Sequence, residues 1–489
     1  MGIVATQSLK NMITTYLGFA IGAVNTLVLY VHFFKDEDYG LVSFLLSAAS
    51  ILMPVLAFGV HSTIVKFYTA YAKKDQDSFL TLMLALPIAV IIPATAILIL
   101  FYDQIADFLT TENEVVAPYI PLIFLIGIAM AYFEVFYAWA RIQLQSVMGN
   151  FMKEVFHRFA VTLLLILFAM NWIDFKAFMA LLGVSYGLRT VIMMFYAFKL
   201  KKPRFVLVFP HDLSRVIKYS ALIIVAGSVA VMILEIDMFM IGKMVPIENV
   251  AFYAVAIYIA TVIAVPSRAM HQITYPLTAR LLNEKNHVAL EDLYKKSSLT
   301  LFIVSGLIFL LILCNIKQLY LMLDPNYSKG LYVVLLVSMA KLLENIMGNN
   351  NAIIYNSDYY RLVLVLGVGM VVIAVVLNTV FIPWLGINGA AIATFIASVG
   401  YCGAKIYVVY KKFHLQPFTR DSAVVSIIMI VLFGLFFFWD FNWHPLVSIA
   451  VKASIISTVY IMVVYRLRIS GEVNDLLHRF LKIGKSRPE

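Results

Sequence analysis

Residues 221–241 read ALIIVAGSVAVMILEIDMFMI, and residues 250–265 read VAFYAVAIYIATVIAV. Each run has about the twenty residues with which an α-helix crosses a hydrocarbon core of roughly 30 Å. The segment between them, Lys243 to Asn249, is too short to be a domain. We therefore predict two antiparallel membrane helices. Glu235 and Asp237 interrupt the first run, and a carboxylate inside a span is costly unless it finds a partner or water.

The composition of the whole chain indicates the same class. Hydrophobic residues make up 62% of its 489 residues and charged residues only 13%, whereas soluble domains carry about 25% charged residues. The polar stretches between the apolar runs are too short for separate soluble domains. We therefore predict an all-α polytopic membrane protein.

Apolar runs along the chain predict about fourteen transmembrane helices. An even number of spans places both termini on one side of the membrane. Lys and Arg gather in the connections on that side, so the positive-inside rule predicts that both termini are cytoplasmic. The net charge of +10 then reflects topology, and we expect no nucleic-acid partner. The spans lie near residues 11–33, 41–65, 79–101, 117–140, 155–172, 177–198, 217–242, 250–272, 297–316, 331–355, 361–382, 388–410, 422–439 and 445–465.

A basic connector, Lys199 to Lys218, follows the sixth span and divides the chain into two six-span halves and a terminal pair. Because each half has an even number of spans, we expect a parallel repeat with a pseudo-twofold axis along the membrane normal. Such transporters bind their substrate at the repeat interface near the midplane. The predicted parts are an N-terminal lobe (1–200), a C-terminal lobe (201–415), an extra helix pair (416–466) and a cytoplasmic amphipathic tail (467–489).

Two stretches resemble a known family. Residues 236–243 (IDMFMIGK), followed by residues 250–256 (VAFYAVA), form one, and residues 382–394 (IPWLGINGAAIAT) form the other. Both resemble patterns of the O-antigen and exopolysaccharide flippases in the multidrug/oligosaccharidyl-lipid/polysaccharide exporter superfamily. The resemblance implies two lobes around a central cavity, with spans 13 and 14 added in the flippase branch.

Cations inside the spans are the strongest functional signals. Arg189 and Lys341 lie near the middle of their spans, too deep to snorkel easily. Arg141 and Lys405 fit snorkelling at inner span ends and rank lower. The resemblance implies, by region, that cations near the inner ends of spans 2 and 8 meet an anionic head group. The substrate-binding candidates are Arg189, Lys341, Arg268, His271, His61, Lys66, Asn345 and Asn349.

Span 10 carries a stripe of polar and small residues at helical spacing. The stripe consists of Lys341, Asn345, Gly348, Ala352 and Asn356, with Glu344 and Asn349 beside it. Two interpretations stay open. One is the wall of a water-lined cavity, and the other is a Lys341–Glu344 ion pair that holds helices together. The candidates for ion coupling or a salt bridge are Asp237, Glu235, Glu344 and Glu134.

These features favour a flippase that moves a polyprenyl-diphosphate-linked oligosaccharide across the bacterial cytoplasmic membrane by alternating access, for surface polysaccharide biosynthesis. The first alternative is a cation-coupled multidrug exporter of the same superfamily, although the midplane excess of charge is basic. The second is a membrane glycosyltransferase or polymerase, which the acidic loop Asp36-Glu37-Asp38 superficially fits. Such enzymes generally carry large extracytoplasmic loops, and the outer loops of this chain are short. We therefore expect a transporter and not an enzyme.

The expected partners follow from this function. They are the lipid-linked oligosaccharide and membrane lipids, and other polysaccharide assembly proteins are open as further partners. We expect a monomer in the bacterial inner membrane, as the resemblance implies. We expect no metal site and no cofactor, and coupling to H⁺ or Na⁺ stays open.

Overall fold

The computed structural model describes residues 3–73, 75–206 and 213–475, and within these ranges helices are the only regular secondary structure. The prediction of an all-α polytopic membrane protein is confirmed. By contact clustering the chain divides into two compact units. Unit 1 contains Met1–Ala254 and Ile382–Gly386, and unit 2 contains Val255–Phe381 and Ile387–Glu489. The predicted lobes, 1–200 and 201–415, rest on symmetry and stay a prediction.

The first part of the chain, as far as α12, contains twelve α-helices and four short 3₁₀ or π segments in its described residues. They are α1 (Ile3–Val24), η1 (Asn25–Leu29), α2 (Tyr30–Phe33), α3 (Asp36–Leu56), α4 (Val60–Phe67), η2 (Tyr68–Ala70), α5 (Gln76–Leu100), α6 (Tyr102–Leu109), η3 (Glu114–Tyr119), α7 (Ile120–Arg141), α8 (Val147–Phe151), η4 (Met152–Phe156), α9 (His157–Ala169), α10 (Phe175–Leu200), α11 (Leu213–Met244) and α12 (Glu248–Thr261).

The second part contains the remaining described helices. They are η5 (Val262–Ala264), α13 (Val265–Asn283), α14 (His287–Tyr320), η6 (Pro325–Gly330), α15 (Leu331–Ile346), α16 (Asn350–Tyr355), α17 (Tyr360–Leu385), α18 (Ile387–Phe413), α19 (Arg420–Phe437) and α20 (Pro445–Arg466).

Twelve helical stretches of the described chain are long and apolar enough to cross a membrane. The two remaining expected spans are broken helices, so the count of fourteen is approximate. The span near 155–172 is the end of the interrupted stretch α8–η4–α9, and the span near 331–355 is split into α15 and α16. The extra pair corresponds to α19 and α20. Most of the predicted amphipathic tail, from residue 476 onward, lies outside the described residues.

Two glycines in left-handed backbone conformations separate helices that a hydropathy profile joins. Gly59 (φ 63°) lies between α3 and α4, and Gly348 (φ 52°) lies between α15 and α16. A Cβ on Gly348 would lie 2.6–3.0 Å from the backbone and Cβ of Ser298 on α14. Only glycine adopts this conformation without a steric penalty, so a glycine marks each break. Phe58, directly before Gly59, is also left-handed (φ 49°).

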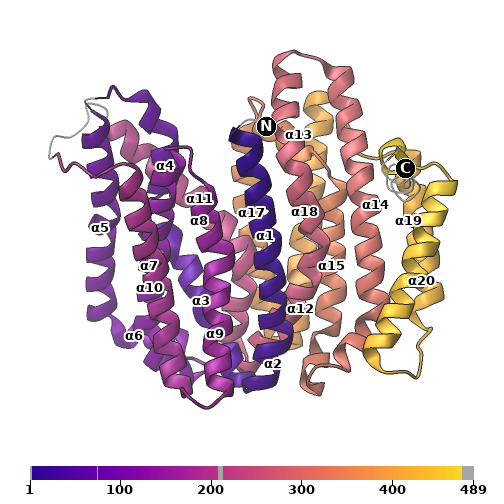
Figure 1. Ribbon diagram of the computed structural model, residues 1–489, viewed down its shortest axis with the longest axis horizontal. Coiled ribbons are helices and arrows are strands. Elements are labelled where there is room, and N and C mark those ends of the chain that lie inside the picture. The colour runs from indigo at the N-terminus through magenta and orange to yellow at the C-terminus, as the bar shows by residue number, and fades with distance from the viewer. Residues whose placement is uncertain (1–2, 74, 207–212, 476–489) are drawn as a thin grey trace, which may run out of the picture. The chain divides into compact units, whose positions relative to one another are not determined.

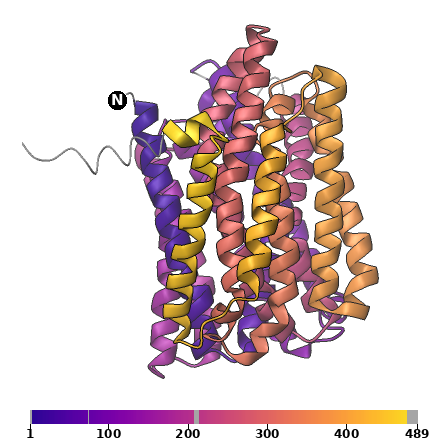
Figure 2. The same cartoon turned by 90° about the vertical axis from the view of Figure 1, so that its right-hand side faces the viewer.

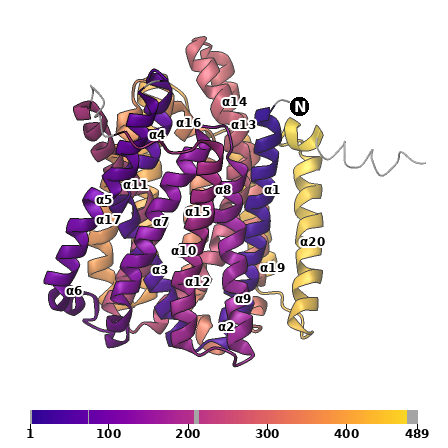
Figure 3. The same ribbon diagram turned by 60° about the vertical axis from the view of Figure 1, so that its left-hand side comes forward.

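Unit 1 is built around α7, which contacts α3, α4, α5 and α10. Figure 1 shows these helices beside α7. Aromatic side chains fill the space between them, and Phe79, Phe133 and Trp139 are almost completely buried. α1 packs against α8, η4 and α9, as Figure 3 shows.

Unit 2 is organised around α14, the longest described helix, with 34 residues. It contacts α13, α15, α19 and α20, and Figure 2 shows the yellow α19 and α20 beside it. Buried Lys452 of α20 is paired with Asp440 at 3.0 Å between Nζ and Oδ1. The Tyr460 hydroxyl donates to the Ile303 carbonyl at 2.9 Å. The extra helix pair is therefore attached to α14 by polar as well as apolar contacts.

Candidate functional site

Arg189 is buried in unit 1, on α10, and only 6% of its surface is exposed. Its guanidinium carbon lies 4.3 Å from the ring centre of Phe133 and 4.8 Å from that of Tyr186. Its Nε has no hydrogen-bond partner, and no carboxylate of the described residues forms an ion pair with it. Glu134 acts on it only from beyond ion-pair distance. A buried cation without a direct ion-pair partner is costly, so Arg189 needs a reason other than stability.

The side chains around Arg189 are polar as well as aromatic. The Tyr186 hydroxyl and His157 Nε2 are hydrogen-bonded at 2.7 Å. Glu134, a coupling candidate on α7, pairs with Lys153 at 2.6 Å. No signal in the sequence connects Lys153 or His157 with Arg189. Both lie on the interrupted stretch η4–α9, at the start of a predicted span, and only the tertiary structure brings them near α10. Charged and hydrogen-bonding side chains thus lie near Arg189 in unit 1.

The remaining candidates of unit 1 lie on α4 and α11. His61 is half-buried, and its Nδ1 has no partner. Lys66 is exposed, with its ammonium 4.0 Å from the ring centre of Tyr219. Asp237 is buried and accepts a hydrogen bond from the Tyr253 hydroxyl at 2.6 Å. The side chain of Glu235 is half-buried, and its backbone carbonyl accepts from Ser47 at 2.8 Å.

In unit 2, Lys341 and Glu344 form the ion pair that was one of the two interpretations of span 10. Lys341 Nζ lies 3.0 Å from Glu344 Oε2, and the two side chains are 17% and 30% exposed. The stripe is not one continuous helix face, because the helix is interrupted at Gly348. The cavity interpretation therefore rests on the partly exposed pair alone.

The amides of the stripe are bonded within unit 2. Asn345 donates to the Ile263 carbonyl at 2.7 Å and to Ser305 Oγ at 2.6 Å. Asn349 donates to Thr278 Oγ1, and its own Oδ1 has no partner. Asn345 is 2% exposed and Asn349 is fully buried. In this conformation both amides connect helices, and their role as substrate ligands stays a prediction.

Lys405 differs from its expected placement. We expected its side chain to snorkel, but it is 2% exposed. Its Nζ donates to Asn351 Oδ1 at 2.8 Å and lies 3.8 Å from the ring centre of Tyr401. The prediction is wrong because α18 continues to Phe413, which places Lys405 two turns inside its helix. Its only sequence signal was a lysine within a long apolar run.

The last two candidates lie on α13. Arg268 is exposed and forms no ion pair with the residues that the structure describes. His271 is half-buried, its ring centre lies 5.1 Å from that of Tyr275, and its Nδ1 has no partner. Both units thus contain intramembrane cations together with amides and tyrosines.

Comparison with known structures identifies the fold. The chain is similar to a lipid II flippase, MurJ, in an inward closed conformation, with a TM-score of 0.73 and 14% identity over 95% of this chain and 100% of that one. It is similar to an inward-facing multidrug resistance transporter of the MATE family in the MOP superfamily, with a TM-score of 0.63 and 15% identity over 89% of this chain and 99% of that one. A MOP transporter from Pyrococcus furiosus, described as having a binding pocket of reverse polarity, gives a TM-score of 0.55 and 13% identity over 83% and 95%.

The sequence itself identifies the family. No curated protein matches the chain. Residues 8–282, more than half of the chain, match the family described as polysaccharide biosynthesis protein. The matched region includes Arg189, Glu134, His61 and Asp237, although a match of this kind assigns no role to single residues. The chain therefore belongs to the polysaccharide biosynthesis protein family, with the fold of the MOP superfamily of transporters.

Proposed function

We propose that this protein is a flippase that moves a polyprenyl-diphosphate-linked oligosaccharide across the bacterial cytoplasmic membrane. Two independent findings support the proposal. The family match indicates polysaccharide biosynthesis, and the fold is that of membrane transporters. The substrate class is inferred from the charges inside the spans.

The observation that carries the substrate class is Arg189. It is a desolvated cation on a membrane-spanning helix and has no carboxylate partner among the described residues. The diphosphate of a lipid-linked sugar is an anion, and moving an unpaired charge into hydrocarbon costs tens of kcal/mol by Born estimates. A diphosphate that pairs with Arg189 avoids most of this cost. Lys341 of unit 2, which is paired with Glu344, is the second candidate cation.

An apolar groove of unit 2 supports a lipid-linked substrate. Its volume is about 350 Å³. It lies between α14, α15 and α19, and side chains such as Phe309, Met339 and Phe433 line it. A polyprenyl tail packs against such a surface while the hydrophilic head group is carried by the cations. The groove includes α19, one of the two helices added after the second predicted lobe.

Alternating access moves the anionic head group outward in the proposed cycle. If the termini are cytoplasmic, each negative charge moving outward gains about 2.3 kcal/mol per 100 mV of membrane potential. This energy biases the direction of transport without ATP. Exchange with H⁺ or Na⁺ is a further proposal, with Glu134 and Asp237 as the carboxylates to examine first.

Complementation tests the function. The gene is expressed in bacteria that lack their own polysaccharide flippase, and surface glycan, accumulated lipid-linked precursor and membrane-inserted protein are measured. We expect surface glycan to return and precursor to fall. The double variant Arg189→Gln/Lys341→Gln should insert normally and leave precursor accumulated.

The matched control removes two exposed cations of α18, Lys411 and Lys412, by substitution with Gln, and should behave as wild type. Normal surface glycan in the Arg189→Gln/Lys341→Gln variant would contradict the site. Increased resistance to cationic drugs with unchanged precursor would instead favour the multidrug exporter.

A further inference from the structure

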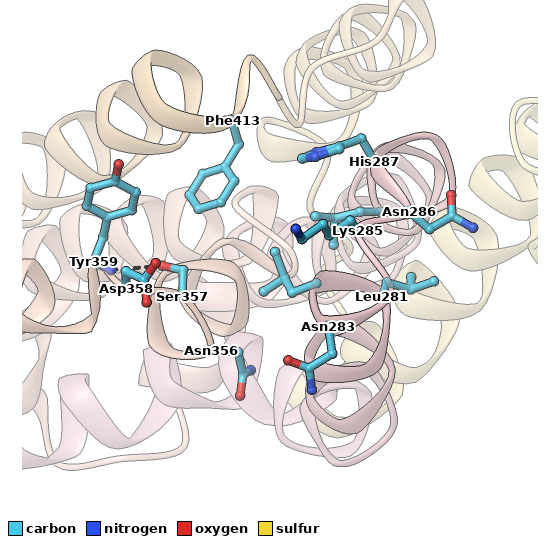
Figure 4. A pocket seen from close by; sticks show the side chains of 12 residues that line it. Leu281, Asn283, Lys285, Asn286, His287, Asn356, Ser357, Asp358, Tyr359 and Phe413 are labelled. Carbon is cyan, nitrogen blue, oxygen red and sulfur yellow. Dashed lines mark hydrogen bonds between the residues drawn. The ribbon is translucent and has the colours of Figure 1, made fainter.

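A pocket with both polar and apolar lining residues lies at the ends of several helices of unit 2. It has a volume of about 390 Å³. The end of α13, the turn into α14, the connection between α16 and α17, and the end of α18 all contribute to its lining. Figure 4 shows the side chains arranged around the open space, with Lys285 and His287 on one side and Asp358 on the other.

The charged groups of this pocket are not paired with other described protein groups. Lys285, His287 and Asp358 are exposed, and no ion pair joins any of them to a described residue. Lys285 stands in the left-handed region (φ 53°), where a non-glycine residue pays a steric cost. Two groups that carry or accept a positive charge thus face a single carboxylate across the pocket.

The other lining residues give the pocket an apolar side. The rings of Tyr359 and Phe413 meet edge to face, with centres 5.9 Å apart, and Leu290 is buried beneath them. Lys412 lies over the Tyr359 ring at 4.8 Å, which adds positive charge nearby. A ligand that fits this lining is small, charged at two points and partly apolar.

The position of the pocket along the helices indicates where this ligand comes from. α17 has 26 residues and α18 has 27, so each is about 40 Å long at 1.5 Å per residue. A bilayer with its headgroup layers is about 40–45 Å thick. The start of α17 and the end of α18, which border the pocket, therefore lie at the level of phospholipid headgroups.

We propose that this pocket binds a phosphoethanolamine group, supplied by the headgroup of a membrane phospholipid. The phosphate lies against Lys285 and His287, and the primary amine donates to the Asp358 carboxylate. A ligand with phosphate alone is disfavoured because Asp358 repels it. A ligand with a quaternary amine is disfavoured because it has no N–H for that carboxylate.

The test uses the purified full-length chain in detergent. Phosphatidylethanolamine, phosphatidylcholine and phosphatidylglycerol with identical short acyl chains are titrated separately, and apparent Kd values are measured from the thermal unfolding midpoint. Phosphatidylcholine and phosphatidylglycerol have no primary amine for the Asp358 carboxylate, so each loses a charge-assisted hydrogen bond. We therefore expect phosphatidylethanolamine to bind about tenfold or more tightly than the other two lipids.

Two substitutions separate the parts of the pocket. Asp358→Asn should reduce the affinity for phosphatidylethanolamine to that of phosphatidylcholine, and Lys285→Gln should weaken the binding of all three lipids. Asp421→Asn and Lys411→Gln, which change exposed charges outside the lining, should change none of the affinities. Equal binding of the three lipids by the wild type, or an unchanged preference in Asp358→Asn, overturns the proposal.

Free O-phosphoethanolamine separates the two sources of the ligand. Competition with phosphatidylethanolamine shows that the group alone is recognised and that a soluble ester can also occupy the pocket. Absence of competition restricts the ligand to membrane lipid. Either result supports the pocket when the Asp358 dependence holds. The assay measures no transport, so its outcome is independent of the proposed flippase function.

Discussion

Replacing Arg189 with methionine separates a substrate-binding role from a structural one. Methionine keeps most of the apolar volume and removes the charge. In the structure the guanidinium contacts the rings of Phe133 and Tyr186, its Nε has no hydrogen-bond partner, and 6% of the residue is exposed. The effect of the substitution on stability can be worked out from these contacts.

The opposing contributions are similar in size. A desolvated cation–π contact contributes about 2 kcal/mol, so the loss of both costs about 4 kcal/mol if they add. Removing a buried charge that has no direct ion-pair partner recovers several kcal/mol of desolvation, and removing an unsatisfied buried donor recovers about 1–3 kcal/mol. We therefore expect Arg189→Met to change the free energy of unfolding by less than about 2 kcal/mol while transport is lost.

The assay combines two measurements on the same variant. Thermal unfolding of the purified protein in detergent reports stability, and complementation of a flippase-deficient strain reports transport. Arg158→Met is the control, because Arg158 pairs with Glu154 at 2.8 Å. Breaking that pair should lower stability and leave transport intact wherever the protein still inserts.

Two outcomes would refute this reasoning. A fall of many degrees in the unfolding midpoint of Arg189→Met would show that the arginine is a structural element. Normal surface glycan with Arg189→Met would show that the substrate does not need this cation. Arg189→Lys should retain part of the activity, since it keeps the charge but loses the planar guanidinium that pairs with phosphate oxygens in a bidentate manner.

Three further predictions concern unit 2. Glu344→Gln leaves Lys341 without its ion-pair partner and should lower the midpoint of thermal unfolding. The double variant Lys341→Met/Glu344→Leu should restore the midpoint. Transport by that double variant would show that the pair only holds helices together. Gly348→Ala should destabilise by about 1–2 kcal/mol from the left-handed backbone alone, and by more from the contact with Ser298, so an unchanged midpoint in thermal unfolding would argue against this geometry. Met339→Lys places a charge in the apolar groove and should reduce surface glycan with normal membrane insertion, while a full glycan level would exclude the groove from tail binding.

Much of the fold could be predicted from the sequence because a bilayer imposes a local rule. Any segment that crosses it must bury about twenty residues of apolar surface and satisfy its own backbone hydrogen bonds. The apolar runs therefore predict helices such as α10 and α17 without knowledge of their neighbours. The Lys341–Glu344 ion pair could also be predicted from the sequence, as one of two interpretations, since residues three apart lie on one side of a helix.

The tertiary structure decided what the local rule leaves open. Hydropathy sums over a window, so it did not detect the left-handed turns at Gly59 and Gly348 that divide two predicted spans. It located Arg189 by depth but not between two aromatic rings. It predicted that Lys405 snorkels at an inner span end, although its ammonium contacts Asn351 and Tyr401. The physical reason is that a buried charge is defined by its partners. Tyr186 and Tyr401 lie on the same helix as their cation, but Phe133 and Asn351 come from other helices, more than fifty residues away in the chain.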